Sequence, residues 1–399
     1  MMNISKRIQS VNESTTMRIA ATAKEMQRRG ENVIDFSVGE PDFNTPVNIK
    51  DAAKRALDNN QTHYTLNQGT FELRQAIAQK LKNENGLNYL PENIIVSTGA
   101  KQCLYNAIQS VIEVDDEVII PAPYYMSYAA MVKLAGGIPV FINTDEETEF
   151  NFTCEQLEHS ITSSTKVLIL SYPTNPTGAC YSEKQLNAIA NIVEKNNLIV
   201  ICDDIYENLI YDDNKFICFA SLNENIKNRT IVVNGFSKSY AMTGWRIGYA
   251  AASLEFVNAM NKLQGHVTSN ASSISQAAAL EALYGPQDSV AAMKKEFESR
   301  RNLIFDLVTS IDGIKCFKPK GAFYLFPNVS CYFGKNSDNY KIENSYDLAM
   351  YLLKEAKVAT VPGNGFGKEG HIRISFSTLQ EKIKEGIGRI RLALQKLSL

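Results

Sequence analysis

The sequence predicts an α/β protein in which a mostly parallel sheet is flanked by helices and a smaller α+β unit follows. Between about residues 90 and 250, short apolar runs alternate with segments of helical periodicity. Strands that alternate with helices are typical of parallel sheets, because each parallel connection has to cross back to the other end of the sheet. After Gly285 and Pro286 the pattern changes to a long charged helix and two isolated strand-like runs, which indicates a separate unit.

Four apolar runs are the clearest expected strands of the first unit. They are residues 94–97, 118–121, 167–170 and 198–202. The run at 198–202 is apolar at every position, as expected for a strand that helices cover on both faces. After the third run, Ser182 and Gln185 have the spacing of a capping box, and the segment that follows repeats apolar residues on one helical face.

The C-terminal part predicts a smaller unit with strands within residues 322–326 and 371–376. Its last helix carries apolar residues at spacings of four and three, which are Ile383, Ile387, Ile390, Leu394 and Leu397. This helix is therefore expected to pack one face against the rest of the unit.

Composition limits the classes of function. The chain has 399 residues, of which 44% are hydrophobic and 21% are charged, as in an ordinary soluble globular protein. The net charge of -2 argues against nucleic-acid and anionic-membrane partners, which favour a basic surplus. No apolar stretch approaches the ~18 residues of a membrane span, so no membrane partner is expected.

The cysteines and histidines indicate a reducing compartment and no structural metal. The seven cysteines are scattered without a Cys-x-x-Cys pair, and the four histidines lack the spacing of zinc ligands. The first residues show no apolar segment of a secretory signal. A cytoplasmic protein without a metal site is therefore expected.

The segment at residues 232–249 carries the most specific chemical signal. A strand-like run ends in Asn-Gly, and Lys238 follows among small residues. An amine that is partly kept from water has a lowered pKa and can form a Schiff base with a carbonyl. Arg246 and Ser237 could bind a phosphate nearby. For an isolated Gly-x-Ser-Lys motif, the alternative is a solvated surface lysine in a turn.

Two further groups follow predicted strands, and open α/β sheets bind ligands at the carboxyl ends of their strands. The turn at residues 97–101 leads into a helix, whose free N–H groups suit a phosphate. Asp203 could hold a pyridine nitrogen in its protonated form, which makes the ring an electron sink. The Tyr206 hydroxyl could donate a hydrogen bond to a phenolate oxygen on the same cofactor ring. The alternative for this pair is a helix N-cap beside a packing tyrosine.

Asn175, Tyr125 and Arg373 also lie near strand ends. The amide of Asn175 could donate to a cofactor oxygen and to a substrate carboxylate, or the residue could simply form an Asn-Pro turn. The Tyr125 ring could stack on a flat cofactor, although an aromatic side chain at such a place is more often part of the core. Arg373 suits bidentate binding of a carboxylate, with a structural salt bridge as its alternative.

The order of these positions resembles that of the class I aminotransferases. From about residue 10 to the C-terminus the sequence presents Gly39-Glu40-Pro41-Asp42, Tyr64, Ser97 to Lys101, Tyr125, Asn175 to Gly178, Asp203 with Tyr206, Ser237-Lys238, Arg246 and Arg373. The chain is most similar to the bacterial aspartate aminotransferases of the subgroup that uses a lysine for the distal carboxylate.

The resemblance implies an architecture and a cofactor. The fold is expected to be fold type I, with a large domain that contains a seven-stranded sheet at residues 46–285. The small α+β domain would consist of residues 1–45 and 286–399. The cofactor would be pyridoxal 5'-phosphate (PLP), and the active form would be a homodimer.

The resemblance also assigns the cofactor contacts. Lys238 would form the Schiff base with PLP and then transfer the proton. Asp203 would pair with the pyridine nitrogen, Tyr206 and Asn175 would bind the phenolate oxygen, and Tyr125 would stack on the ring. The implied phosphate contacts are Gly99, Ala100, Lys101, Ser237 and Arg246, with Tyr64 reaching in from the second subunit.

The implied reaction transfers the amino group of L-aspartate to 2-oxoglutarate in two half-reactions. Arg373 and Asn175 would clamp the α-carboxylate next to Tyr125, and the backbone at Gly39 would close over it. These residues would serve both the amino acid and the 2-oxo acid.

Lys101 is the candidate for the side-chain carboxylate, with Ser14 and Thr16 as further hydroxyl donors. Lys101 could instead contact the phosphate alone, and the two hydroxyl residues could cap a helix at 17–26. An aminotransferase for aromatic or other amino acids and a PLP-dependent lyase stay open. A PLP-binding regulator is disfavoured because no basic arm is present, and a Rossmann dehydrogenase because an early Gly-x-Gly-x-x-Gly is missing.

Three positions depart from the pattern of close relatives. Tyr125 stands where tryptophan is common and Ala100 where glycine is common, and both changes are mild because the ring and the backbone N–H remain. Asn12 stands where relatives that accept prephenate have a lysine, which argues against prephenate as a substrate.

Overall fold

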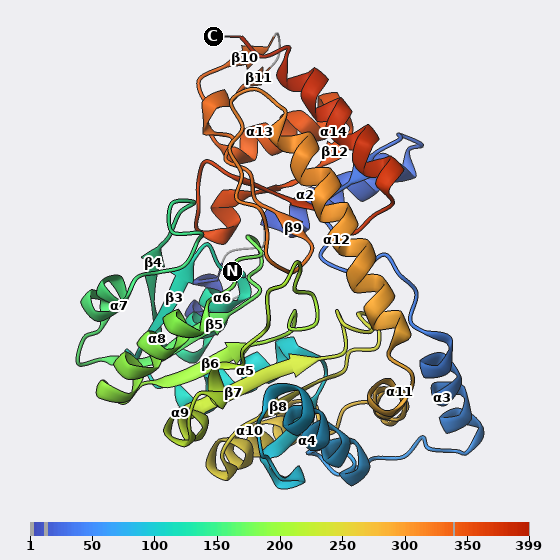
Figure 1. Cartoon of the computed structure of the whole chain (residues 1–399), viewed down its shortest axis with the longest axis vertical. Coiled ribbons are helices and arrows are strands. Elements are labelled where there is room, and N and C mark those ends of the chain that lie inside the picture. The colour runs from blue at the N-terminus through green and yellow to red at the C-terminus, as the bar shows by residue number, and fades with distance from the viewer. Residues whose placement is uncertain (1–3, 12–14, 338–339, 399) are drawn as a thin grey trace.

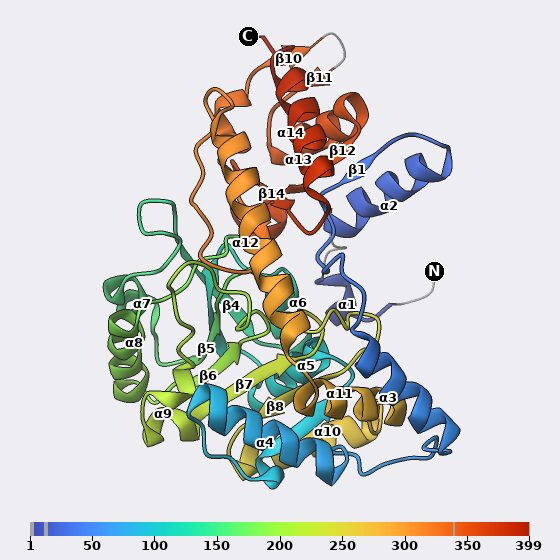
Figure 2. The same cartoon turned by 45° about the vertical axis from the view of Figure 1, so that its right-hand side comes forward.

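The computed structural model describes residues 4–11, 15–337 and 340–398. Figures 1 and 2 show a layered part built around a large sheet and a smaller part that carries the C-terminus. The long helix α12 (Asp288–Thr309) follows α11 (Ser273–Tyr284) of the layered part and runs up along the smaller part. The chain therefore passes from the layered part to the smaller part through α12.

The large sheet has the strand order β2-β8-β7-β6-β5-β3-β4. Its strands are β2 (Ile94–Ser97), β3 (Glu117–Ala122), β4 (Ile138–Asn143), β5 (Thr165–Ser171), β6 (Ile199–Asp203), β7 (Thr230–Gly235) and β8 (Gly248–Ala251). β8 runs antiparallel to both of its neighbours, and the other adjacent pairs are parallel. The prediction of a mostly parallel seven-stranded sheet is confirmed. Strand β8 consists of small residues and one tyrosine, so its apolar pattern did not indicate it.

Helices cover both faces of the sheet because its strands are apolar on both sides. Ile201 and Ile231 pack toward one layer, whereas Val200 and Val232 pack toward the other. The first layer is formed by α5 (Ala100–Val111), α6 (Ser127–Ala135) and α10 (Leu254–Val267). The second is formed by α3 (Val47–Asp58), α4 (Phe71–Asn85), α7 (Cys154–Ser160), α8 (Glu183–Lys195), α9 (Glu224–Arg229) and α11.

Helix α8 begins with the predicted capping box. The Ser182 hydroxyl accepts the Gln185 N–H, and the Gln185 side chain accepts the Ser182 N–H. The apolar face that follows is buried. This local signal therefore identified both the start of the helix and the face that packs on the sheet.

The smaller part contains a three-stranded antiparallel sheet in the order β13-β14-β9. Its elements are β9 (Tyr324–Leu325), β13 (Val361–Pro362), β14 (Ile372–Ser375), the hairpin strands β10 (Asn336–Ser337) and β11 (Tyr340–Lys341), α13 (Ser345–Tyr351), a π-helical turn at Leu352–Ala356 and α14 (Gln380–Leu394). Both predicted strands are present, although each is shorter than its apolar run. The predicted apolar face of α14 is buried.

The N-terminal residues join the smaller part through two elements. Strand β1 (Ile34–Asp35) pairs in parallel with β12 (Val358–Ala359), and α2 (Thr15–Arg28) buries Ile19, Ala23 and Met26 there. The short helix α1 (Lys6–Gln9) lies beside α6 of the layered part instead. The domain limits at residues 45/46 and 285/286 remain a prediction.

The topology brings the carboxyl ends of β5, β6 and β7 together. In the register of the sheet, Ser171 of β5 is paired with Asp203 of β6, and Asp203 is paired with Val233 of β7. The loops that follow these strands carry several of the expected site residues. None of the helices in the described part of the chain has the length and apolar character that crossing a membrane requires.

Candidate active site

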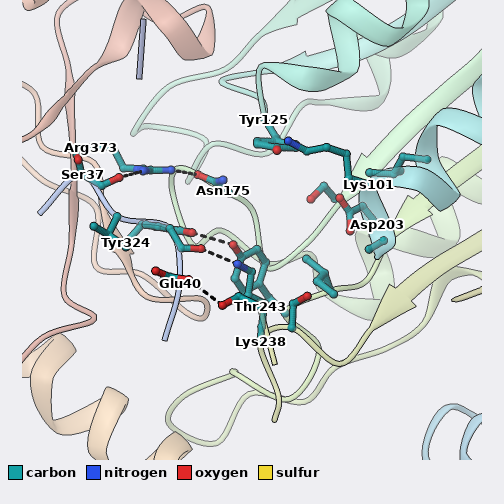
Figure 3. A pocket seen from close by; sticks show the side chains of 18 of the residues that line it. Ser37, Glu40, Lys101, Tyr125, Asn175, Asp203, Lys238, Thr243, Tyr324 and Arg373 are labelled. Carbon is teal, nitrogen blue, oxygen red and sulfur yellow. Dashed lines mark hydrogen bonds between the residues drawn. The ribbon is translucent and has the colours of Figure 1, made fainter. Parts of the chain in front are cut away.

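A cavity of about 670 Å³ lies at the carboxyl ends of these strands and is lined by residues of both parts. Its volume is typical of a site for a cofactor and a small substrate. The predicted site residues that line it are Gly39, Ala100, Lys101, Tyr125, Asn175, Asp203, Tyr206, Ser237, Lys238, Arg246 and Arg373. Figure 3 shows several of these side chains pointing toward a common space. The fold therefore collects in one place residues that lie far apart in the sequence.

Lys238 follows β7 and reaches across the cavity to the N-terminal segment. Its Nζ donates to the backbone carbonyl of Gly39 at 2.5 Å. The pKa of Lys238 is lowered to about 8. Burial is the largest cause, the charges of Arg373 and Arg246 also lower it, and Glu40 opposes them. A substantial fraction of the amine is therefore neutral near physiological pH, as a nucleophile requires.

Asp203 lies at the end of β6 with one carboxylate oxygen bonded and the other free. The Tyr128 hydroxyl donates to Oδ2 at 2.6 Å, and Oδ1 is buried with no hydrogen-bond partner among the described residues. Burial raises the pKa of Asp203 to about 6, while the Tyr128 hydrogen bond and the charge of Lys238 lower it. A buried oxygen without a partner is costly. Oδ1 of Asp203 is therefore suited to accept a hydrogen bond from the protonated ring nitrogen of a heteroaromatic cofactor.

The start of α5 and Arg246 form a place for an anion. The N–H groups of Ala100 and Lys101 lie in the first turn of α5, where a helix offers no internal acceptors. Gly99 has φ +84°, and a Cβ there would lie 2.4 Å from Nη2 of Arg246. The absence of a side chain at Gly99 thus lets the guanidinium approach the turn. Ser237 lines the same cavity, so the group suits a phosphate.

Arg373 and Asn175 form the expected clamp. Nη1 of Arg373 donates to Oδ1 of Asn175 at 3.0 Å, and Nη2 donates to the carbonyl of Ser37 at 2.7 Å. Nε of Arg373 is buried and has no partner among the described residues. The guanidinium is therefore held on two sides within a cavity that a carboxylate can enter.

Lys101 provides a second cation in this cavity. Its Nζ lies 5.5 Å from the centroid of the Tyr125 ring. Among the described residues, it has no carboxylate partner within 4.0 Å. An exposed ammonium group without an acidic partner is available to an anionic ligand, either a phosphate or a substrate carboxylate.

Gly99 is not among the residues that line the cavity, although it lies next to Arg246, which does. Three more predicted residues are not placed in the cavity. Tyr64 is 92% exposed and does not line it. Ser14 lies outside the described residues, as does Asn12, and the side chain of Thr16 is not described.

Sequence reasoning missed four residues that act on the predicted groups. Ser37, Tyr128 and Tyr324 form hydrogen bonds with them, and the charge of Glu40 raises the pKa of Lys238. Glu40 and Tyr128 lay within or next to motifs that the sequence had marked, so their positions offered a weak signal. Ser37 acts through its backbone carbonyl, and Tyr324 lay in a run that predicted only a strand, so neither had a chemical signature.

Comparison with known proteins supports the same assignment. The family described as "Aminotransferase class I and II" matches residues 31–390. An aspartate aminotransferase from Bacillus sp. (strain YM-2) is 46% identical over 387 residues, which cover 97% of this chain and 98% of that protein.

Two solved structures have the same fold along nearly the whole chain. The aspartate aminotransferase from Rhizobium meliloti has a TM-score of 0.96 and 42% identity, with 100% of both chains covered. The aspartate aminotransferase from Thermus thermophilus with maleate has a TM-score of 0.93 and 36% identity, with 98% of this chain and 100% of that chain covered. The chain therefore belongs to the class I and II aminotransferases, enzymes of fold type I whose cofactor is PLP.

Proposed function

We propose that the protein transfers the amino group of L-aspartate to 2-oxoglutarate, which yields oxaloacetate and L-glutamate. The observation that carries this proposal is the pair of cations, Arg373 and Lys101, that line one cavity with Lys238. Both substrates carry two carboxylates, and each cation can take one of them. The names of the relatives and the maleate, a dicarboxylate, in the Thermus thermophilus structure support the same substrate class.

The residues present fit the cofactor. PLP, when bound, supplies an electron sink for the pair of electrons left at the α-carbon of the amino acid. Asp203 would hold the charge on its ring nitrogen, Tyr206 and Asn175 would donate to its phenolate oxygen, and Tyr125 would cover its ring. The phosphate would lie among Gly99, Ala100, Lys101, Ser237 and Arg246.

The chain's own groups then act on the substrate. Arg373 and Asn175 orient the α-carboxylate, so that the α-hydrogen faces Lys238. Nζ of Lys238, in its neutral form, accepts the α-proton and returns it two atoms away, beyond the amino nitrogen, which completes a 1,3-proton shift. The second substrate enters the same site after the first product has left, which makes the reaction ping-pong.

The proposal is tested by the absorption spectrum of the PLP-bound enzyme with one substrate at a time. Addition of L-aspartate alone should convert the visible band to the shorter-wavelength band of the amine form of the cofactor, and 2-oxoglutarate should restore it. L-Alanine and L-phenylalanine serve as controls. Conversion by phenylalanine or alanine but not by aspartate would replace the proposed substrate class.

Replacement of Lys101 with serine is expected to reduce kcat/KM for aspartate by roughly ten- to a hundredfold, the value of one charge-assisted hydrogen bond. Activity toward alanine should change little, because alanine has no second carboxylate. Steady-state kinetics with both amino acids measure the ratio.

The matched control for this prediction is Lys24→Ser. Lys24, on α2, also lines the cavity and is exposed, but it is not assigned to the substrate. An equal loss for both amino acids in Lys101→Ser, together with release of PLP, would assign Lys101 to the phosphate. A loss of kcat/KM for aspartate but not for alanine in Lys24→Ser would show that Lys24, on α2, binds the second carboxylate instead.

We also propose a homodimer in which Tyr64 serves the phosphate site of the other subunit. The 92% exposure of Tyr64 supports this, because its ring and hydroxyl reach no group of their own chain's cavity. Replacement of Tyr64 with phenylalanine should weaken PLP retention by roughly ten- to a hundredfold. Dialysis against buffer followed by measurement of bound PLP tests this.

Mixed dimers distinguish a contact across subunits from one within a subunit. A dimer of one Tyr64→Phe chain and one Lys238→Ala chain contains one site with both native residues only if Tyr64 crosses the interface. Such a mixture should recover tight PLP retention in one site per dimer. No recovery, or a fully active monomer in sedimentation, contradicts the proposal. We place this dimer in the cytoplasm, as the scattered cysteines suggest.

A further inference from the structure

Tyr324 contacts a group in each half of the active site. Its side chain is fully buried on β9, the strand next to β14, which carries Arg373. Its hydroxyl oxygen lies 2.8 Å from the Tyr206 hydroxyl oxygen. Its ring lies under the Arg373 guanidinium, 4.5 Å from ring centroid to Cζ.

The hydroxyl of Tyr324 also packs against the N-terminal segment. A Cβ at Gly39 would lie 3.2 Å from the Tyr324 hydroxyl oxygen. The carbonyl of the same residue accepts the Lys238 Nζ hydrogen bond. Tyr324 therefore lies at the junction of the groups that handle cofactor, carboxylate and proton.

The number of hydrogens decides the direction of the hydrogen bond between the two tyrosines. A phenol has a single hydrogen to donate. If Tyr206 gives its hydrogen to the cofactor, its oxygen can only accept from Tyr324. Among the described residues, the Tyr324 hydroxyl has no other hydrogen-bond partner. The hydrogen of Tyr324 is thus available for this contact.

The charge state of the pair is compatible with this direction. Burial raises the pKa of both hydroxyls above the ordinary tyrosine value, so both keep their hydrogens at neutral pH. The charge of Arg373 opposes the rise in both cases. Consecutive hydrogen bonds polarise one another. Donation from Tyr324 to Tyr206 therefore strengthens the hydrogen bond that Tyr206 donates to the cofactor.

We propose that Tyr324 is a positioning residue with two separable parts. Its hydroxyl donates to Tyr206 and strengthens the hydrogen bond from Tyr206 to the phenolate oxygen of the cofactor. Its ring holds the guanidinium of Arg373 in place for the substrate carboxylate. This inference rests on the proposed roles of Tyr206 and Arg373.

The hydroxyl is tested by pH titration of the visible band of the PLP-bound enzyme. Donors to a phenolate oxygen favour its anionic form and lower its pKa. Tyr206→Phe should therefore raise the midpoint pH of the visible-band titration. Tyr324→Phe should raise this midpoint by about half a pH unit to one pH unit. Because Tyr324 acts through Tyr206, the double variant should titrate like Tyr206→Phe alone.

The role of the Tyr324 ring is tested by the affinity of the PLP-bound wild type and Tyr324 variants for maleate, an unreactive dicarboxylate. Tyr324→Phe keeps the ring and should bind maleate within about twofold of the wild type, whereas Tyr324→Leu should bind about five- to tenfold more weakly. Circular dichroism and thermal unfolding verify that each variant is folded. Should Tyr324→Leu not fold, the titration of Tyr324→Phe still decides the role of the hydroxyl.

The outcomes separate this inference from the proposed function. A shift in Tyr206→Phe without one in Tyr324→Phe overturns the role of the Tyr324 hydroxyl. An additional shift in the double variant overturns the claim that Tyr324 acts through Tyr206. No shift in Tyr206→Phe itself contradicts the proposed contact between Tyr206 and the cofactor. Equal maleate affinity in Tyr324→Leu and the wild type overturns the role of the ring.

Discussion

Replacement of Lys238 with alanine is expected to lower kcat by about 10⁴-fold or more, because general acid–base catalysis alone contributes up to about that factor. The variant also loses the amine that bonds to the cofactor, so exchange of the cofactor between lysine and substrate is lost as well. Single-turnover measurements with aspartate should show that the slow step is the proton transfer. Added methylamine should restore part of the rate, since a free amine can replace the missing base.

Borohydride reduction of the PLP-bound enzyme identifies the lysine directly. Peptide mapping should find the reduced cofactor on Lys238 in the wild type and in the Lys24→Ser control. Label on another lysine would contradict the assignment.

The same lysine predicts a pH dependence of cofactor uptake. The amine reacts with an aldehyde only in its neutral form, and the neutral fraction of Lys238 rises as the pH passes its pKa of about 8. The rate of PLP uptake by the cofactor-free protein should therefore increase through about pH 8 and level off above it. An ordinary lysine would give this rise near pH 10.4. A midpoint in that higher range would contradict the effect of burial.

Replacement of Asp203 with asparagine is expected to slow proton abstraction by about 10²–10³-fold, which is typical for the loss of one group that stabilises charge in the transition state. Asparagine keeps the size of the side chain but lacks the charge that holds the ring nitrogen protonated. PLP affinity should fall much less than the rate. Rapid-mixing kinetics with aspartate and a PLP dissociation measurement give the two quantities separately.

The neighbouring residue Asp204 provides a matched control. It is also fully buried, and burial raises its pKa well above the ordinary range. Its contact is with Cys218 Sγ at 3.3 Å, and it does not line the cavity. Asp204→Asn should therefore keep close to the wild-type rate. A normal rate in Asp203→Asn with a large loss in Asp204→Asn would show that the wrong carboxylate had been chosen.

The sequence by itself determined the architecture and the chemical groups at the strand ends. The alternation of apolar runs and helices predicted the sheet, since buried strands and amphipathic helices leave local periodic patterns. The capping box at Ser182 likewise acts between residues three apart. Lys238 and Asp203 each follow a recognisable strand, and their positions along the chain carried the resemblance to the family.

Only the tertiary structure decided which of these groups meet and how each is tuned. Arg373 and Asn175 are 198 residues apart, Lys238 and Gly39 are 199 apart, and Tyr206 and Tyr324 are 118 apart. Such contacts depend on how the smaller part packs over the sheet, and no local pattern encodes them. The lowered pKa of Lys238 and the raised pKa of Asp203 both arise first from burial, which is a property of the folded cavity. Tyr324 shows the limit most clearly, because its run predicted a strand, whereas its role comes from the two side chains that the fold places against it.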